Sequence, residues 1–183
     1  MSTYNIDVAH SRIGFAVKHM VISTVRGKFN EVTSTVNVNE EQPEAAQINV
    51  EINAATVDTG VEFRDNDLRS NNFFDVEQYP TISFKSTQIE PLGGSEYRIT
   101  GDLTMHGVTK PVAVTGVVEG PTKDPWGNDR VGVELVGRLS RKDWGLTYNA
   151  ALETGGMVVG DEVRLEIDAE YTKVPEGATA TQA

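Results

Sequence analysis

Histidine is the side chain best suited to bind a metal or to carry a proton near neutral pH. The chain has three histidines, His10, His19 and His106. His10 and His19 are nine positions apart, and this odd offset places them on opposite faces of a strand unless a bulge intervenes. His106 lies far from both in the sequence. The spacing therefore predicts no metal site and indicates histidines that are hydrogen-bonded in strands or turns.

The other residue types that carry catalysis form no recognisable constellation. The chain has no cysteine, which excludes thiolate nucleophiles and iron–sulfur clusters. It has no nucleophile elbow, phosphate-binding glycine loop or dinucleotide fingerprint. Most acidic side chains fall on the outer faces of expected strands, although Asp65 and Asp67 lie beside aromatic residues. The sequence predicts no cofactor and favours a protein that is not an enzyme; an enzyme would have to use His19, Asp65 or His106.

The composition limits the partners of the protein. Among 183 residues, 16 are Lys or Arg and 27 are Asp or Glu, giving a formal net charge of −11. Such a chain repels phosphate backbones, so we expect no nucleic-acid partner. The longest apolar runs have three residues, which predicts no stable membrane insertion. The first residues lack the basic start and apolar stretch of a secretion signal, so we expect a cytoplasmic protein.

The elements that must position these residues are strands, because the dominant hydrophobic pattern has period two. Residues 162–172 show it best, with Val163, Leu165 and Ile167 on one face and charged side chains on the other. The alternation recurs in residues 13–19, 32–38, 48–54, 82–86, 97–105, 112–118 and 131–139. Most connections are too short for parallel crossovers. We therefore expect an all-β fold of about eight antiparallel strands.

Strands of this kind can pack as a sandwich or close into a barrel, and a barrel has no exposed edges. A barrel of about eight strands can hold one small ligand. The expected inward rows include Gly101, Gly116 and Gly137. These glycines leave volume inside the barrel, or they mark bends and bulges; the pattern leaves both readings open.

Helix is scarce in the pattern, and residues 58–70 are the one segment that predicts a short helical insert. We expect residues 1–174 to form a single barrel domain. Residues 175–183 are rich in Ala, Thr and Gly and have no apolar pattern, which predicts a disordered tail.

Several ordered motifs resemble the YceI-like family, and together they cover residues 4 to about 173. The first are residues 7–19 (DVAHSRIGFAVKH) and 25–29 (VRGKF). The central ones are residues 64–70, 73–76 (FFDV) and 79–84 (YPTISF). Residues 101–109 (GDLTMHGVT) and 143–146 (DWGL) complete the set. The resemblance implies a lipocalin-like extended antiparallel barrel whose tunnel holds a polyisoprenoid or another long-chain amphiphile such as a fatty-acyl lipid. It also implies a homodimer, and many members of the family are exported.

With this fold, the expected function is binding, storage or transport of a long apolar lipid. The residues expected to line the tunnel are Phe15, Val17, Phe29, Ile52, Phe84, Ile99, Leu103, Met105, Val114, Leu139, Trp144, Leu165 and Ile167. The residues expected near a polar head group or the tunnel mouth are His19, Arg64, Asp65 and Lys142. Two alternatives stay open: a lipid-modifying enzyme that uses His19, Asp65 and His106, and a β-sandwich that binds other proteins through an exposed apolar patch.

Overall fold

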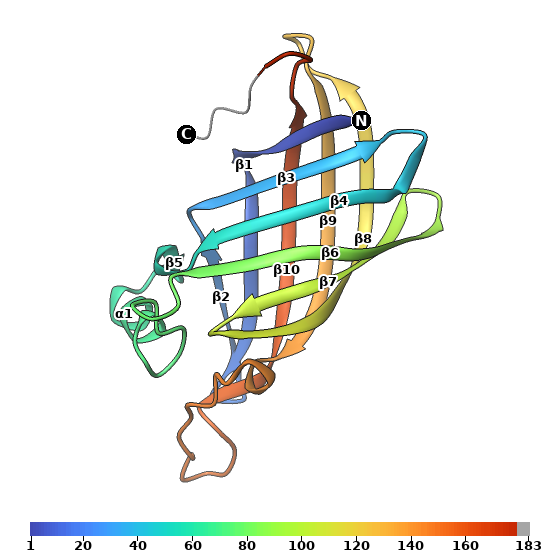
Figure 1. Cartoon of the computed structure of the whole chain (residues 1–183). Helices are drawn as coiled ribbons and strands as arrows, with labels where there is room; N and C mark the ends of the chain where they lie inside the picture. Colours follow the sequence, from blue (N-terminus) through green and yellow to red (C-terminus); the bar gives the residue numbers. More distant parts are fainter. Residues whose placement is uncertain (179–183) are drawn as a thin grey trace.

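The computed structural model describes residues 1–178, and within them ten strands form one continuous antiparallel sheet (Figure 1). The strands are β1 (Ser2–His19), β2 (Ser23–Phe29), β3 (Val32–Asn39), β4 (Gln42–Asn53), β5 (Val57–Asp58), β6 (Thr81–Gly93), β7 (Glu96–Met105), β8 (Val108–Lys123), β9 (Asp129–Ser140) and β10 (Val159–Lys173).

The sheet closes on itself because β1 pairs with β10. Eight of the described strands form this closed barrel in the order β1, β3, β4, β6, β7, β8, β9, β10. β1 is long enough to pair with β3 near its start and with β2 near its end, and β5 extends the wall beyond β2. The prediction of about eight antiparallel strands in a lipocalin-like barrel is confirmed, and the sandwich alternative is wrong.

The period-two pattern places the apolar rows on the inner face of the barrel, as the register of β10 shows. Leu165 is paired with Gly137 on β9 and with Phe15 on β1, and Ile167 is paired with Leu135 and Ile13. The inward side chains of neighbouring strands therefore meet inside the barrel. They form three apolar clusters, the largest of which lies around Trp144, Ile82 and Leu139.

The barrel has two ends that differ in their connections (Figure 1). At one end lie the start of β1, the end of β10, the β3–β4 and β6–β7 turns and the β8–β9 loop; we call it the termini end. At the other end lie the β1–β2 and β7–β8 turns and the long β4–β6 and β9–β10 connections; we call it the helix end. These long connections contain the helices η1 (Ala54–Thr56), α1 (Glu62–Arg69) and η2 (Arg141–Trp144).

The predicted helical insert is confirmed as α1, and polar contacts hold it against the barrel. The buried Asp65 carboxylate accepts hydrogen bonds from the Thr59 backbone N–H (2.8 Å) and hydroxyl (2.5 Å). The Arg69 guanidinium donates to the carbonyl oxygens of Ala55 (2.7 Å) and Val57 (3.1 Å). The insert is therefore a fixed cover at the helix end. No helix within residues 1–178 has the length and apolar character needed to cross a membrane.

The inward glycines allow neighbouring strands and side chains of the barrel wall to pack closely. A methyl group at Gly116 would overlap the carbonyl oxygen of Glu134 on the neighbouring strand, and one at Gly101 would overlap the ring of Phe84. Gly101 also lies beside a bulge in the pairing of β6 with β7. The reading of these glycines as sites of bends and close approach is the one that the structure supports.

The chain beyond β10 is described only in part. At residues 175–178 the backbone turns, with the Ala178 N–H donating to the Pro175 carbonyl oxygen at 3.2 Å. Residues 179–183, the remainder of the tail that the sequence predicts to be disordered, lie outside the described residues, so disorder there stays a prediction.

Candidate functional site

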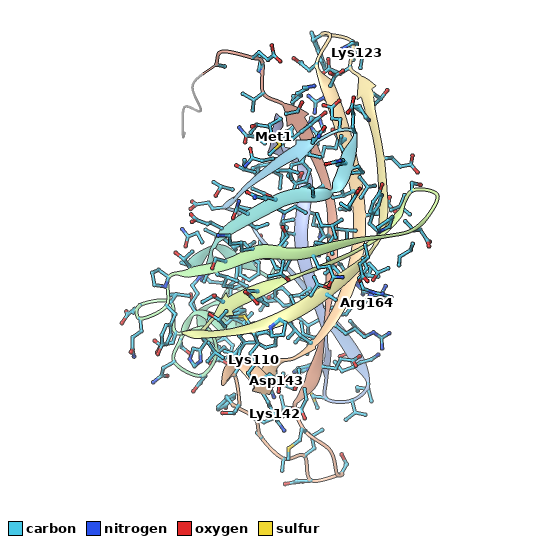
Figure 2. All side chains as sticks on the ribbon, turned by 45° about the vertical axis from the view of Figure 1, so that its right-hand side comes forward. Met1, Lys110, Lys123, Lys142, Asp143 and Arg164 are labelled. Atoms are coloured by element: carbon cyan, nitrogen blue, oxygen red, sulfur yellow. The ribbon has the colours of Figure 1, made fainter. Side chains whose placement is uncertain are left out.

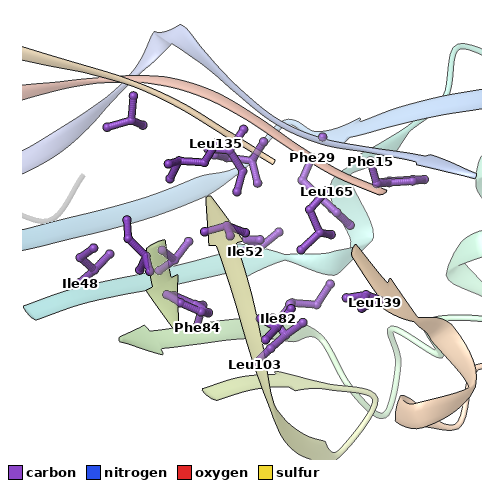
Figure 3. Close-up of a pocket in the computed structure, with 18 of the residues that line it drawn as sticks. Phe15, Phe29, Ile48, Ile52, Ile82, Phe84, Leu103, Leu135, Leu139 and Leu165 are labelled. Atoms are coloured by element: carbon purple, nitrogen blue, oxygen red, sulfur yellow. The ribbon is translucent and has the colours of Figure 1, made fainter. Parts of the chain in front are cut away.

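A cavity of about 540 Å³ occupies the interior of the barrel, within the range of sites that hold small molecules. Its wall is made by inward side chains from opposite sides of the barrel, including Phe15, Phe84 and Leu165 (Figure 3). Among its lining side chains in residues 1–178, two are charged, Glu40 and Arg141. An apolar interior space of this kind favours an apolar ligand, because contact with the wall removes the surface of the ligand from water.

Twelve of the thirteen side chains predicted to line a tunnel do line this cavity. They are Phe15, Val17, Phe29, Ile52, Phe84, Ile99, Leu103, Met105, Val114, Leu139, Leu165 and Ile167. Most of them lie on strands whose alternation of apolar and polar residues was clear in the sequence. The apolar positions of each strand therefore predicted which side chains face the interior. Their contact with a ligand stays a prediction.

Trp144 is the exception, since it does not line the cavity. It follows the end of β9, in the helix η2, and only 2% of its surface is exposed. Its indole N–H donates to the carbonyl oxygen of Leu103 at 3.0 Å, which turns the ring into the packed core at the helix end. The prediction that Trp144 lines the tunnel is therefore wrong, because its ring is held in the core by a contact outside the strand rows.

The helix end of the cavity is closed around Arg141. Its side chain is almost fully buried, with 3% exposed, and it donates to four backbone carbonyl groups of the β9–β10 connection and the start of β10. Burial lowers the pKa of its guanidinium, and Asp161 opposes this effect from 3.6 Å. The carbonyl oxygens belong to Leu146, Tyr148, Val159 and Gly160. Arg141 therefore fixes the long connection across the floor of the cavity.

The termini end carries the other charged lining residue, Glu40. Its Oε1 accepts hydrogen bonds from the Tyr4 hydroxyl (2.9 Å) and the Lys173 ammonium (2.7 Å). These donors, with the Ser2 hydroxyl, lower the pKa of Glu40 to about 2, and Lys173 makes the largest contribution. Burial, with a further contribution from Glu40, raises the pKa of Tyr4 to about 12. Glu40 is thus ionised and Tyr4 is protonated at neutral pH.

None of the four predicted head-group residues lines the cavity. The Arg64 guanidinium donates to the Thr59 hydroxyl at 2.7 Å, and Asp65 also binds Thr59 as described above. Lys142 pairs with Asp161 at 3.0 Å, and Figure 2 places it at the opposite end of the molecule from Met1 and Lys123. His19 pairs with Ser23 and Val159 at the end of β1. The prediction placed the polar groups at the helix end, where local contacts already hold three of these side chains.

The residues considered for catalysis do not form a unit in the structure. The Nδ1–H group of His106 donates a hydrogen bond to the Trp144 carbonyl oxygen at 3.1 Å, and the His106 ring packs against Tyr79. The Asp65 carboxylate is bound to Thr59. Within residues 1–178 no hydrogen bond joins His19, Asp65 and His106.

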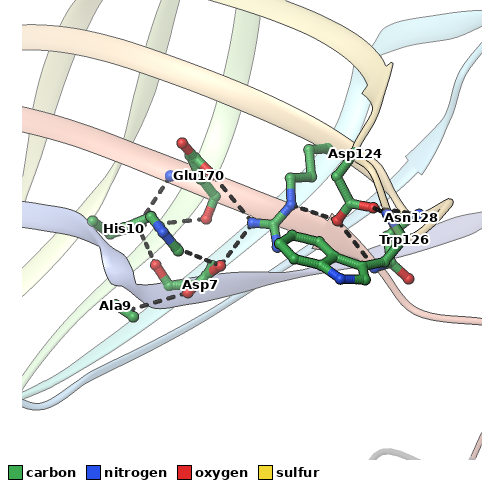
Figure 4. Close-up of polar contacts among 9 residues, drawn as sticks. Asp7, Ala9, His10, Asp124, Trp126, Asn128 and Glu170 are labelled. Atoms are coloured by element: carbon green, nitrogen blue, oxygen red, sulfur yellow. Dashed lines mark hydrogen bonds and ion pairs between the residues drawn. The ribbon is translucent and has the colours of Figure 1, made fainter.

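One group with metal-ligating atoms lies on the outer wall, and the sequence analysis did not identify it. Asp7, His10 and Glu170 each offer an atom within 4.8 Å of the others. However, the Arg130 guanidinium donates to Asp7 (2.7 Å) and to Glu170 (3.1 Å), so a fixed cation already balances these carboxylates (Figure 4). The hydrogen bond from Arg130 is also the main reason why the pKa of Asp7 is lowered. This arrangement ties β9 to β1 and β10.

Comparison with known proteins identifies the family. Residues 4–171 match the YceI-like domain family. The chain belongs to this family. Protein YceI of Escherichia coli O157:H7 is 39% identical over 145 residues, which are 78% of this chain and 75% of that protein. A UPF0312 protein of Staphylococcus aureus strain N315 is 31% identical over 173 residues, 94% of this chain and 98% of that protein.

Solved structures of YceI-type barrels share the fold. BcnA of Burkholderia cenocepacia has a TM-score of 0.79 at 23% identity and covers 90% of this chain and 98% of its own. The YceI protein of Campylobacter jejuni has a TM-score of 0.74 at 27% identity and covers 86% and 90%. A polyisoprenoid-binding domain of Saccharophagus degradans has a TM-score of 0.70 at 15% identity and covers 93% and 98%. The lipocalin-like YceI barrel predicted from the motifs is therefore confirmed.

Proposed function

We propose that the protein binds a long apolar lipid, isoprenoid or fatty-acyl, inside its barrel. The observation that carries this proposal is the cavity of about 540 Å³ inside the barrel, with an almost wholly apolar wall. The name of the Saccharophagus degradans domain, a polyisoprenoid-binding domain, gives it further support. Storage or transport of the lipid is the role that follows for a protein of this kind.

The cavity wall explains how such a lipid would be held. Each buried CH₂ group contributes about 0.8 kcal/mol before the cost of ordering the chain. A tail of about ten such groups therefore gains ~8 kcal/mol without any polar contact. Because these contacts have no direction, we expect weak selectivity among tails of similar length.

The contacts of His19, Asp65 and His106, the residues that an enzyme would use, favour a protein that binds its ligand without a reaction. Asp65 and His106 are engaged in local hydrogen bonds, and neither they nor His19 line the cavity. The tail of a bound lipid would meet mostly hydrocarbon side chains along the wall. We therefore propose that the protein returns its lipid unchanged.

The test is recovery of the lipid from the purified full-length protein. Native mass spectrometry should detect one bound long-chain species per barrel, and organic extraction should release it intact. Leu103→Trp replaces an isobutyl side chain of the cavity wall with an indole ring, which fills part of the cavity and should abolish the bound species. The matched control is Asp102→Trp, because Asp102 is exposed and adjacent on the same strand. A protein that is free of lipid, and that takes up neither polyprenyl nor fatty-acyl lipids, would contradict the proposal.

The location and assembly of the protein are further proposals. We propose that the protein is a homodimer, as the resemblance implies, and that it works in the cytoplasm. Light scattering coupled to size exclusion measures the mass of the assembly, and cell fractionation measures the location. A monomer at micromolar concentration, or recovery outside the cytoplasm, would contradict the respective statement.

A further inference from the structure

The exposure of the lining residues distinguishes the two ends of the cavity. Three residues of the lining are exposed, Glu40, Gly120 and Pro121, and all three lie at the termini end. At the helix end, the lining residues Phe73, Arg141 and Leu146 are buried. In the described chain, the cavity therefore reaches solvent between the β3–β4 turn and the β8–β9 loop. A lipid with its tail in the barrel would present its polar head at that mouth.

The buried cation at the opposite end offers little to a head group. All three guanidinium nitrogens of Arg141 already donate to backbone carbonyl groups, at 2.6 to 3.4 Å. Asp161 lies 3.6 Å from it and supplies opposite charge. An anionic head placed there would have to replace contacts that hold the β9–β10 connection in place.

Glu40 has the chemistry of a hydrogen-bond acceptor with spare capacity. A carboxylate offers about four lone-pair sites. Tyr4, Lys173 and the Ser2 hydroxyl use at most three of them, and Tyr4 and Lys173 both donate to Oε1. The remaining capacity suits a ligand group that donates a hydrogen bond. Because Glu40 is ionised and cannot donate in return, it repels a second carboxylate or a phosphate.

The other charges at the mouth also disfavour an anionic head. Residues 40–44 contain three glutamates and no Lys or Arg. The Lys173 ammonium group forms an ion pair with the Glu40 carboxylate at 2.7 Å. On the β8–β9 side, Lys123 pairs with Asp129 at 2.7 Å and Arg130 pairs with Asp124 at 2.9 Å. Lys173, Lys123 and Arg130 therefore each have an acidic partner.

We infer that the natural ligand is a long-chain alcohol whose hydroxyl donates a hydrogen bond to Glu40 at the mouth, rather than a lipid phosphate or a fatty acid. This inference rests on the proposed function and adds the class of head group. The tail supplies the affinity, and Glu40 selects the head. Lys173, once released from Glu40, would instead favour an anion.

The test compares three ligands with one tail length: geranylgeraniol, geranylgeranyl monophosphate and the headless hydrocarbon phytane. Competition against radiolabelled geranylgeraniol, below micelle-forming concentrations, measures each affinity. The wild-type protein should bind the alcohol about tenfold more tightly than the phosphate, the size expected for one hydrogen bond to a charged group. Glu40→Gln should remove this preference, since it discharges the acceptor and frees Lys173 for the phosphate.

The matched control is Glu41→Gln, which removes one charge from the same turn but from a residue outside the cavity lining. It should keep most of the preference. A wild-type protein that prefers the phosphate, or a preference unchanged in Glu40→Gln, overturns the inference while lipid binding stands. If none of the three ligands binds, phytane included, and the protein takes up no fatty-acyl lipid either, the proposed function itself fails.

Discussion

Trp144 offers a direct test of which aromatic side chains support the barrel and which face the cavity. The change Trp144→Phe removes the hydrogen bond to the Leu103 carbonyl group, worth about 1 kcal/mol. The smaller ring also leaves space in a core position where only 2% of the side chain is exposed, which costs roughly another 1 kcal/mol. We expect the free energy of unfolding to fall by ~2 kcal/mol. For a chain of this size the melting temperature then falls by about 4–8 °C.

Lipid affinity should not change with that substitution, because Trp144 does not line the cavity. The assay pairs thermal unfolding followed by circular dichroism with the ligand competition described above. The control is Trp126→Phe, since Trp126 is 81% exposed and its loss should leave the melting temperature unchanged. The chain has two tryptophans, so this control also leaves Trp144 as the single indole fluorophore, and iodide should quench it poorly. A Trp144→Phe protein with unaltered melting temperature and lost lipid binding would refute the assignment of Trp144 to the core.

Two further predictions concern the wall and the mouth of the barrel. Gly116→Ala should lower the free energy of unfolding, measured in urea, by about 3 kcal/mol, because the new methyl group would overlap the Glu134 backbone. The control Gly132→Ala should have little effect, since there is open space around that position. Equal losses of stability in the two variants would contradict this explanation. The folded-state pKa of Glu40 is about 2, against 4.5 for the free side chain, so its ion pair stabilises the fold above pH ~5 and loses this effect as the pH falls toward 2. Glu40→Gln should therefore reduce stability at neutral pH by no more than ~1 kcal/mol, since the side chain is 43% exposed, and the difference from the wild type should vanish near pH 2.

The barrel was predictable because its signal is repeated in every strand. The alternation of apolar and polar residues assigns each side chain of a strand to the inner or the outer face of the sheet. Closure of the sheet into a barrel leaves no strand edge exposed. The helix end was predicted less well. Trp144 and the charged residues of α1 lie where the backbone leaves the strand period, and their directions depend on contacts such as those with Leu103 and Thr59. A sequence pattern carries no information about such contacts.

The outer cluster of Asp7, Glu170 and Arg130 illustrates a second limit. His10 belongs beside them because β1 is irregular between Asp7 and Arg12, where its pairing with β10 shifts. The alternation of a single strand does not predict which residue of a partner strand lies opposite. The pairing of β9 with β10 and of β10 with β1 therefore had to be seen before Arg130 could be assigned to these carboxylates.

The two charged residues of the cavity, in contrast, can be predicted from the sequence. The inward row of β3 contains Val36 and Val38, and two positions further along lies Glu40. The inward row of β9 ends with Leu139, and two positions further lies Arg141. A charged side chain in phase with an apolar row, just beyond the last residue of a strand, faces the end of the barrel interior. The two charged residues of the cavity are therefore reached by extending the inward rows of β3 and β9 by two positions, and this step places Glu40, not a residue of α1, at the mouth.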